Sequence, residues 1–196
     1  MRKLLLATHN PHKKREILAL LKDLPIDVMT LDDLGDQDQV IEDGDTFFDN
    51  AFKKACYFSK KYHMMTLADD SGLCVHALEG RPGVHSARFS NQGDKQNNHK
   101  LLFLMDKHPN RQAHFVSCLV LCLENQSPIV FEGILEGLIA EEAQGSNGFG
   151  YDPIFYVPAY GMTLAQMDMA QKNQLSHRAI ALQRLMRWFN ETFNHE

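Results

Sequence analysis

The stretch Thr66-Leu67-Ala68-Asp69-Asp70-Ser71-Gly72-Leu73 holds the strongest signal for the fold and its site. An apolar run from Met64 to Ala68 leads into two aspartates and a glycine, which is typical of a buried strand followed by a turn. We therefore expect both carboxylates where a strand leaves its sheet, the place where open α/β sheets bind ligands. Adjacent carboxylates repel unless a cation or shared proton intervenes, so the pair indicates a cation site; a solvated Asx turn is the alternative.

Length and composition predict one globular domain over residues 1–196, with 44% hydrophobic and 23% charged residues. A net charge of -5 argues against general affinity for nucleic acid or an anionic membrane, because both require a basic surface. The apolar start breaks at Thr8, too early for a signal peptide, and no apolar run is long enough for a membrane span. We expect a cytoplasmic protein whose small, phosphate-bearing ligand lies in a local basic pocket.

The cysteines form no Cys-x-x-Cys pair; they are Cys56, Cys74, Cys118 and Cys122. We interpret them as reduced core residues of a cytoplasmic protein, with metal binding as the alternative.

Hydrophobic periodicity predicts strands alternating with helices. The expected strands are Lys3–Ala7, Asp27–Leu31, Met64–Ala68, Leu73–Leu78, His114–Leu123 and Ile129–Ile139. The expected helices are Pro11 to about Leu24, Thr46–Tyr62, Asn97–Lys107 and a last helix opening at Ser176. Loops are expected at Leu34–Asp45, which is acidic, and at Glu79–Gln92, whose length is typical of functional loops.

The first turn, Thr8 to Lys14, joins a strand to a helix in which Pro11 suits the first position. Such an opening points backbone N–H groups at a ligand, and the helix dipole favours an anion there. The cations Lys13, Lys14 and Arg15 oppose the dipole, so their clustering indicates an anion; a solvated basic turn is the alternative.

Three glycines in six residues, Gly145 to Gly150, indicate unusual backbone geometry or close approach to a ligand. A glycine-rich loop alone is a weak signal. The ring of Phe149, flanked by glycines, is more informative because it offers a face for stacking.

The polar residues fall into six motifs. These are Ala7-Thr8-x-Asn10-x-x-Lys13, Glu42-Asp43-Gly44-x-Thr46-Phe47-x-x-Asn50-Ala51-x-x-Lys54-Ala55, Ala68-Asp69-Asp70-Ser71-Gly72-Leu73, Pro82-Gly83-x-x-Ser86-Ala87-Arg88, Gly148-Phe149-Gly150-Tyr151-Asp152-Pro153-Ile154-Phe155 and Ser176-His177-Arg178. With these motifs in this order over nearly its whole length, the chain resembles the inosine triphosphate pyrophosphatase family, the non-canonical purine NTP pyrophosphatases.

The resemblance implies an α/β fold with a long central mixed sheet flanked by helices, and two lobes with a nucleotide cleft between them. It implies Mg²⁺-dependent hydrolysis of ITP, dITP or XTP to the monophosphate and pyrophosphate, which cleanses the nucleotide pool. It also implies a homodimer.

Matched positions take roles from the resemblance. Glu42 and Asp70 approach the metal, and Asp70 accepts the proton of the attacking water. The phosphates fall to Thr8, His9, Asn10, Pro11, His12, Lys13 and Ser71, and the base to Phe149, Gly150, Tyr151, Asp152, Lys172, His177 and Arg178. Lys54 and Arg88 are further substrate-binding candidates, because cationic side chains would offset charge on the leaving pyrophosphate. The family commonly has glycine where this chain has His9 and His12, which weakens the case for close backbone approach in this turn.

A hydrogen-bond donor beside the O6 and N7 acceptors favours hypoxanthine or xanthine over adenine, whose 6-amino group is itself a donor. Arg178 is the best-placed donor by motif, with His177 and Lys172 as the others; a surface position on the last helix is the alternative for Arg178. Phe149 would stack on any base.

Two other interpretations stay open. The first is a module that binds purine nucleotides without cleaving them. The second is a pyrophosphatase for other modified nucleotides. Glu42, Asp69 and Asp70 have no evident use in binding alone, and this favours an enzyme.

Overall fold

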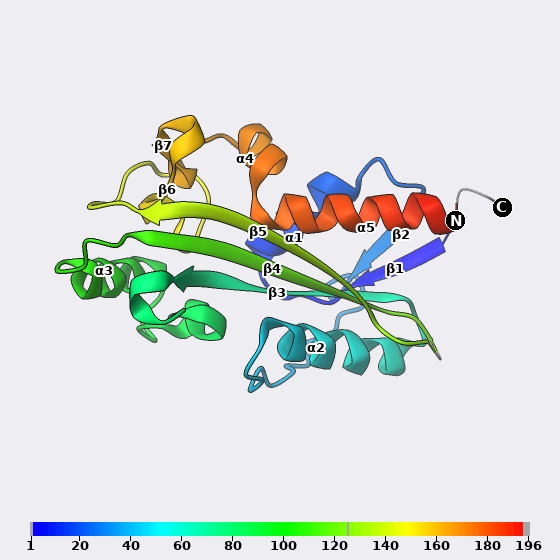
Figure 1. The fold of residues 1–196 in the computed structure, drawn as a ribbon. Helices are drawn as coiled ribbons and strands as arrows, with labels where there is room; N and C mark the ends of the chain where they lie inside the picture. The colour runs from blue at the N-terminus through cyan, green and yellow to red at the C-terminus, as the bar shows by residue number, and fades with distance from the viewer. Residues whose placement is uncertain (1, 125, 194–196) are drawn as a thin grey trace. The chain divides into compact units, whose positions relative to one another are not determined.

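The structure is a computed structural model that describes residues 2–124 and 126–193 (Figure 1). Its strands are β1 (Arg2–Leu6), β2 (Ile26–Thr30), β3 (Thr66–Val75), β4 (Gln112–Cys122), β5 (Ile129–Ile139), β6 (Phe155–Val157) and β7 (Met162–Thr163). Its α-helices are α1 (Pro11–Leu21), α2 (Phe47–Tyr62), α3 (Asp94–Met105), α4 (Met169–Leu175) and α5 (His177–Phe193). Short 3-10 helices include η1 (His76–Leu78) and η2 (Gly83–Arg88).

The strands form a seven-stranded sheet in the order β2-β1-β3-β4-β5-β6-β7. β1 pairs in parallel with both β2 and β3, whereas β6 pairs antiparallel with both β5 and β7. The predicted mixed sheet flanked by helices is therefore confirmed. The nucleotide cleft remains a prediction.

The chain divides into two compact units, and β3, β4 and β5 each contribute residues to both. Unit 1 comprises residues 1–70, 117–133 and 178–196, and unit 2 comprises residues 71–116 and 134–177.

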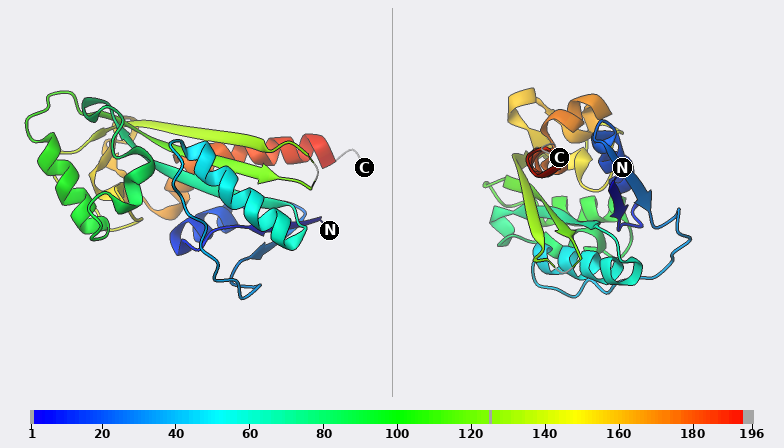
Figure 2. Two further views of the ribbon diagram at one scale, coloured as in Figure 1. Left: turned by 90° about the horizontal axis from the view of Figure 1, so that it is seen from below. Right: turned by 90° about the vertical axis from the view of Figure 1, so that its right-hand side faces the viewer.

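The core of unit 1 has a layer on each face of its strands, because successive side chains of a strand point to opposite faces. Leu4 and Leu6 of β1 pack with residues of α1 and α5, whereas Leu5 packs with residues of α2. The views in Figure 2 show α5 and α2 on opposite sides of these strands. The apolar faces of the three helices thus fix the strands that carry the candidate site.

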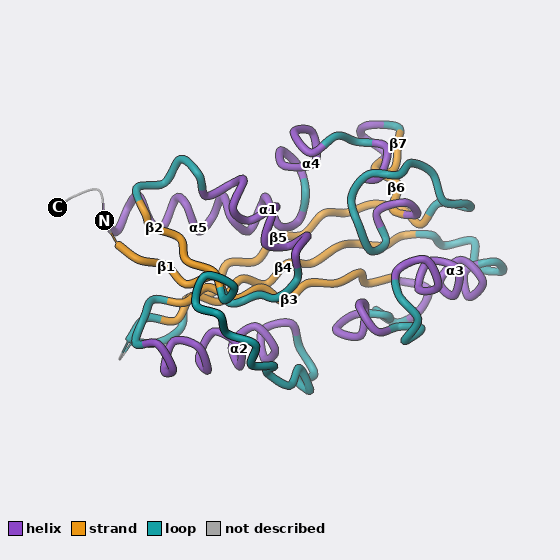
Figure 3. The backbone as a smooth tube through the Cα atoms, turned by 180° about the vertical axis from the view of Figure 1, so that it is seen from behind, coloured by secondary structure: helices purple, strands orange, loops and turns teal. Residues whose placement is uncertain are grey.

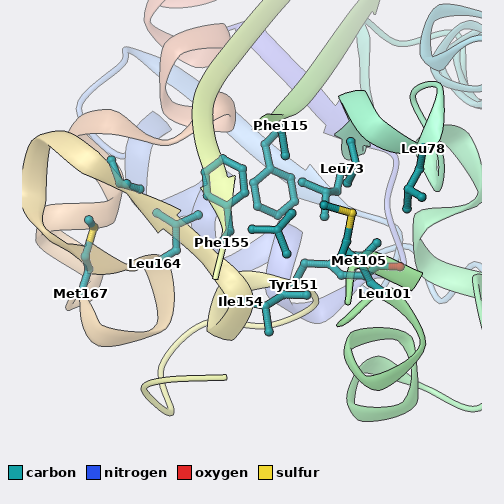
Figure 4. Packing of buried hydrophobic residues seen from close by; sticks show 14 residues of the cluster. Leu73, Leu78, Leu101, Met105, Phe115, Tyr151, Ile154, Phe155, Leu164 and Met167 are labelled. Carbon is teal, nitrogen blue, oxygen red and sulfur yellow. The ribbon is translucent and has the colours of Figure 1, made fainter. Parts of the chain in front are cut away.

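Unit 2 has its own core, drawn in Figure 4. Phe115 of β4 and Phe155 of β6 lie with ring centroids 4.6 Å apart, and Leu101 and Met105 of α3 are fully buried in the same cluster. Tyr151, from the glycine-rich loop, also packs here. The loop is therefore anchored at its end by hydrophobic burial.

The prediction that a strand ends at the acidic pair is wrong, because β3 continues through Asp69 and Asp70 to Val75. Consecutive polar residues interrupt the apolar pattern, but both carboxyl groups are buried and bonded to neighbouring elements, which lets the strand continue. The alternative, a solvated Asx turn at Asp69 and Asp70, is wrong for the same reason.

The predicted separate strand Leu73–Leu78 is also wrong, because β3 runs on to Val75 and His76–Leu78 forms η1. Three other local predictions hold. Pro11 begins α1, Thr46 caps α2 and the segment before α2 is loop (Figure 3). The sequence missed the short helix α4, and the long loop after β3 contains η2. Among the described residues, no helix has both the length and the apolar character required to cross a membrane.

Candidate active site

Asp69 is a fully buried carboxylate of unit 1 with partners on three other elements. Its Oδ1 accepts a hydrogen bond of 2.7 Å from Ser117 Oγ of β4, and its Oδ2 lies 3.0 Å from Lys13 Nζ and 3.2 Å from Arg178 Nη2. Arg178 also forms an ion pair with Glu16 of α1. Residues from α1, β3, β4 and α5 therefore meet in one buried charge network.

The surroundings of Asp69 hold it ionised. Complete burial by itself would raise the pKa of this carboxyl, but the charges of Lys13 and Arg178 and the Ser117 hydrogen bond outweigh that cost. The pKa of Asp69 therefore lies well below its ordinary value. A carboxylate with a lowered pKa is a weak proton acceptor, so Asp69 suits a fixed partner for Lys13 and Arg178.

Asp70 differs, although it is the next residue. Its Oδ2 accepts a hydrogen bond of 3.1 Å from Asn50 Nδ2 of α2, and its side chain is buried. Burial raises the pKa of Asp70 above its ordinary value; Lys13 and Lys54 oppose the shift, and the charges of Glu42 and Asp69 add to it. A carboxylate with a raised pKa is a better proton acceptor, as general base catalysis requires.

Glu42 and Lys54 complete this part of unit 1. Lys54 Nζ donates to Glu42 Oε1 at 2.9 Å and to the backbone oxygen of Asp69 at 2.8 Å. α2 supplies Asn50 and Lys54 from positions four apart, which lie on one face of a helix. Lys54 thus links Glu42 to the backbone of Asp69, the residue before Asp70.

The first turn is arranged around Asn10, the N-cap of α1. Asn10 Oδ1 accepts hydrogen bonds of 3.0 Å from the backbone N–H groups of His12 and Lys13, and Thr8 Oγ1 accepts from the Asn10 N–H. His9 bonds to the backbone oxygen of Asp38. Asn10 therefore satisfies two of the backbone donors that we expected to point at a phosphate.

Unit 2 also holds a buried ion pair, between Lys172 of α4 and Asp152. Lys172 Nζ lies 2.6 Å from Asp152 Oδ2, which also accepts a hydrogen bond of 2.9 Å from the Phe149 N–H. The same ammonium group lies 4.9 Å from the centroid of the Phe149 ring. The structure thus brings together three residues that the sequence assigned to the base.

Glycine is required at position 148 for two reasons. Its φ is +76°, a conformation that L side chains rarely adopt, and a Cβ there would overlap the Asp152 carboxylate. Gly150 also has a positive φ, of +62°, but the space around it is open. The glycine pattern indicated that the backbone approaches another group closely. At Gly148 that group is the Asp152 carboxylate.

Two residues of α3 hold the glycine-rich loop in place. Asp94 accepts a hydrogen bond of 2.8 Å from the Gly150 N–H, and Asn98 Nδ2 donates to the Gly150 oxygen at 3.1 Å. Tyr151 donates to the backbone oxygen of Ser86 at 2.8 Å. α3 and η2 thus position the loop from two sides.

His177 is buried in unit 2, where its ring stacks on Phe115 with centroids 4.7 Å apart and planes 10° from parallel. Arg178, the next residue, belongs to unit 1 and is 1% exposed. The surface alternative for Arg178 is therefore wrong. Its contact with a base stays a prediction, since its described bonds are to Glu16 and Asp69.

The remaining candidates lie in unit 2. Ser71 is half-buried in β3, and Arg88 is exposed at the end of η2. Sequence reasoning missed Glu16, Ser117, Asp94 and Asn98 as positioning residues. Nothing in the hydrophobic pattern marked these four residues, because each has its partner on another segment of the chain.

Comparisons with known proteins agree on one family. The family model described as the Ham1 family matches residues 4–188. A dITP/XTP pyrophosphatase from Thermoanaerobacter sp. (strain X514) is 43% identical over 93% of this chain and 94% of its own length. Another of that name, from Leuconostoc mesenteroides subsp. mesenteroides, is 45% identical over 93% of this chain and 94% of its own.

A solved structure supports the same grouping. The HAM1 protein from Coxiella burnetii matches this structure with a TM-score of 0.90 and 38% identity, covering 97% of this chain and 100% of that chain. The family resemblance drawn from the six motifs is thereby confirmed. The chain belongs to the Ham1 family.

Proposed function

We propose that this protein hydrolyses non-canonical purine nucleoside triphosphates, such as ITP, dITP and XTP, to the monophosphate and pyrophosphate. The observation that carries the proposal is the contrast between two adjacent buried carboxylates: Asp69 is paired with Lys13 and Arg178, whereas Asp70 accepts a hydrogen bond from Asn50 and has a raised pKa. The dITP/XTP pyrophosphatases among its relatives support the substrate class.

The donor set in unit 1 fits Mg²⁺. Four carboxylates, Glu16, Glu42, Asp69 and Asp70, are linked to three cations, Lys13, Lys54 and Arg178. A triphosphate adds further negative charge to a network in which anions already outnumber cations, so a divalent cation is needed for balance. Mg²⁺ prefers oxygen ligands and one or two carboxylates, which Glu42 and Asp70 offer.

When bound, Mg²⁺ would polarise the phosphoryl oxygens and favour loss of a proton from a nearby water. The chain's own residues do the rest. Asp70 takes the proton of the water that attacks the α-phosphorus, and the bond between that phosphorus and the bridging oxygen breaks to release pyrophosphate. Lys13 and Lys54 offset the charge that develops on the leaving group.

In unit 2, we assign base binding to Phe149, Lys172 and His177. The Phe149 ring is half-buried and supplies a stacking surface that accepts any base. Lys172 and His177 are hydrogen-bond donors of the kind that suits O6 and N7 of hypoxanthine. The buried Asp152 carboxylate holds Lys172 and the Phe149 backbone in place.

A product analysis tests the proposal. Purified protein is incubated with ITP, dITP, XTP, ATP and GTP, with Mg²⁺ or with a chelator, and products are separated without added inorganic pyrophosphatase. We expect pyrophosphate and the monophosphate, fastest with ITP, dITP and XTP, and only with Mg²⁺. Orthophosphate and a nucleoside diphosphate as first products would rule out cleavage between the α- and β-phosphates.

Two variants sharpen the assay. Asp70→Asn should lower turnover by roughly 10²–10⁴-fold, the usual loss on removing a general base. Asp23→Asn, at an exposed position just after α1, is the matched control and should keep normal turnover. Nucleotide binding without turnover in the unaltered protein would instead support a binding module.

We also propose a homodimer, in keeping with the family resemblance. Sedimentation equilibrium over a range of protein concentrations tests it directly. A single species at the mass of one chain would contradict it.

A further inference from the structure

Three potential metal ligands gather in unit 2 among residues that take no part in the candidate active site. They are His76, the first residue of η1, His114 of β4 and Glu136 of β5. One ligand atom from each lies within 4.8 Å of the other two. Three segments that are far apart in the sequence thus present nitrogen and oxygen ligands at one point.

The spacing of the two histidines matches the requirement of a metal ion. His76 Nε2 and His114 Nδ1 lie 3.2 Å apart. Two nitrogen ligands at the usual zinc–nitrogen distance, on a tetrahedral ion, are about 3.3 Å apart. The two rings are inclined at 69° to each other, so they are not stacked, and their closest described approach is between these two nitrogens.

The side chains are also accessible to an ion. His114 is half-buried between the buried residues Ala113 and Phe115, so strand alternation turns it to the opposite face of β4. His76 and Glu136 are exposed. The Glu136 carboxylate oxygen lies within 4.8 Å of both histidine nitrogens, and water can reach this side chain.

The alternative for the two histidines is a hydrogen bond between neutral rings, in which one nitrogen donates and the other accepts. That bond accounts for the 3.2 Å distance but gives no role to Glu136. The carboxylate is the third ligand that distinguishes a metal site from a histidine pair.

We propose that His76, His114 and Glu136 form a binding site for a divalent transition-metal ion, best matched by Zn²⁺, with water as its fourth ligand. Imidazole and carboxylate are established zinc ligands, and three protein ligands with one water is a recurrent arrangement. Mg²⁺ prefers oxygen ligands only, so the site differs in selectivity from the carboxylates of unit 1.

An ion bound here ties the chain after β3 to β4 and β5. Because the unfolded chain does not hold the three ligands together, binding favours the folded state and raises the melting temperature with zinc concentration. The expected role is stabilisation of unit 2, independent of nucleotide hydrolysis.

Calorimetric titration of metal-free protein with ZnCl₂, in excess Mg²⁺ and without nucleotide, tests the proposal. We expect a single zinc ion per chain. His114→Gln should weaken zinc binding by at least about tenfold, since losing only an outer-shell partner of a ligand can cost that much. His99→Gln, at an exposed histidine of α3 in the same unit, is the matched control and should bind as the unaltered protein does.

Two further measurements keep the result clear. Co²⁺ absorption bands should appear with the unaltered protein and with Asp70→Asn, and should be lost in His114→Gln and in Glu136→Gln. His76→Gln, at an exposed position, replaces His114→Gln if the latter fails to fold. The proposal is overturned if the unaltered protein binds no zinc, or if removing these ligands leaves the binding curve unchanged.

Discussion

Asp69 and Asp70 are neighbours in β3, yet their surroundings move their pKa values in opposite directions. Adjacent residues of a strand point to opposite faces of the sheet, so the two carboxyl groups meet different partners. Asp69 meets Lys13 and Arg178, whereas Asp70 meets the amide of Asn50. This difference predicts opposite effects of the same substitution at the two positions.

Asp69→Asn should destabilise the metal-free protein by about 3–5 kcal/mol, the usual cost of removing one partner from a buried ion pair. Asp70→Asn should instead raise the melting temperature. The stability contributed by a carboxyl whose pKa is raised by folding is fully present below its unfolded pKa and is lost as pH rises through its folded pKa. At neutral pH the ionised Asp70 therefore opposes folding, and an amide relieves the cost. Chemical and thermal unfolding with chelator present measure both changes; equal losses in the two variants would contradict the assignment.

The stability contribution of Asp36 should depend on pH. Hydrogen bonds from Lys61, then from Tyr62 and the Asp38 N–H, lower its pKa to about 2. A lowered pKa stabilises the folded state above the unfolded pKa of about 3.9, and this stability is lost as pH falls toward the folded value. The difference in unfolding free energy between Asp36→Asn and the unaltered protein should therefore be constant above about pH 5 and shrink below about pH 4. A difference that persists unchanged down to about pH 2 would exclude this cause.

Gly148→Ala should weaken nucleotide binding with little effect on turnover at saturation. The added Cβ would displace the Asp152 carboxylate and strain a backbone with φ of +76°, which disturbs Phe149 and Lys172. Gly150→Ala is the matched control, because its φ of +62° gives strain of the same kind while the space around it is open. The measurement is the Kd of a non-hydrolysable ITP analogue. Equal losses in both variants would show that backbone strain alone is responsible.

Arg178→Ala should reduce stability by about 3–5 kcal/mol, because it leaves the buried carboxylates of Glu16 and Asp69 short of a cation. Arg184→Ala, at an exposed position on the same helix, should cost far less. The ratio of kcat/KM for ITP and ATP is measured on both variants. A narrowed ratio in Arg178→Ala, with stability unchanged, would favour the direct contact with the base that the motif predicts.

Sequence reasoning succeeded where a signal is local. Pro11 and Thr46 mark helix starts, because proline suits the first helical position and a threonine side chain can cap a helix. Glycine at position 148 indicates a backbone that can adopt a positive φ. The predicted end of the strand at Asp69 was wrong, because the hydrophobic pattern alone could not show that this carboxylate has buried partners. Its partners Ser117 and Arg178 are 48 and 109 residues away in the sequence, and only folding brings them together.

Because unit 1 is built from three separate segments of the chain, the two units are completed at different times during synthesis on the ribosome. Unit 2 is complete once residue 177 has been made, whereas unit 1 still lacks α5 at that point. Until α5 has been made, Leu4 and Leu6 of β1 lack the part of their packing that α5 provides. Asp69 and Glu16 also lack their ion-pair partner Arg178. We expect nascent chains stopped before residue 178 to expose this apolar surface and to bind chaperones. Unit 1 therefore completes its packing after unit 2, although its first residues are made earlier.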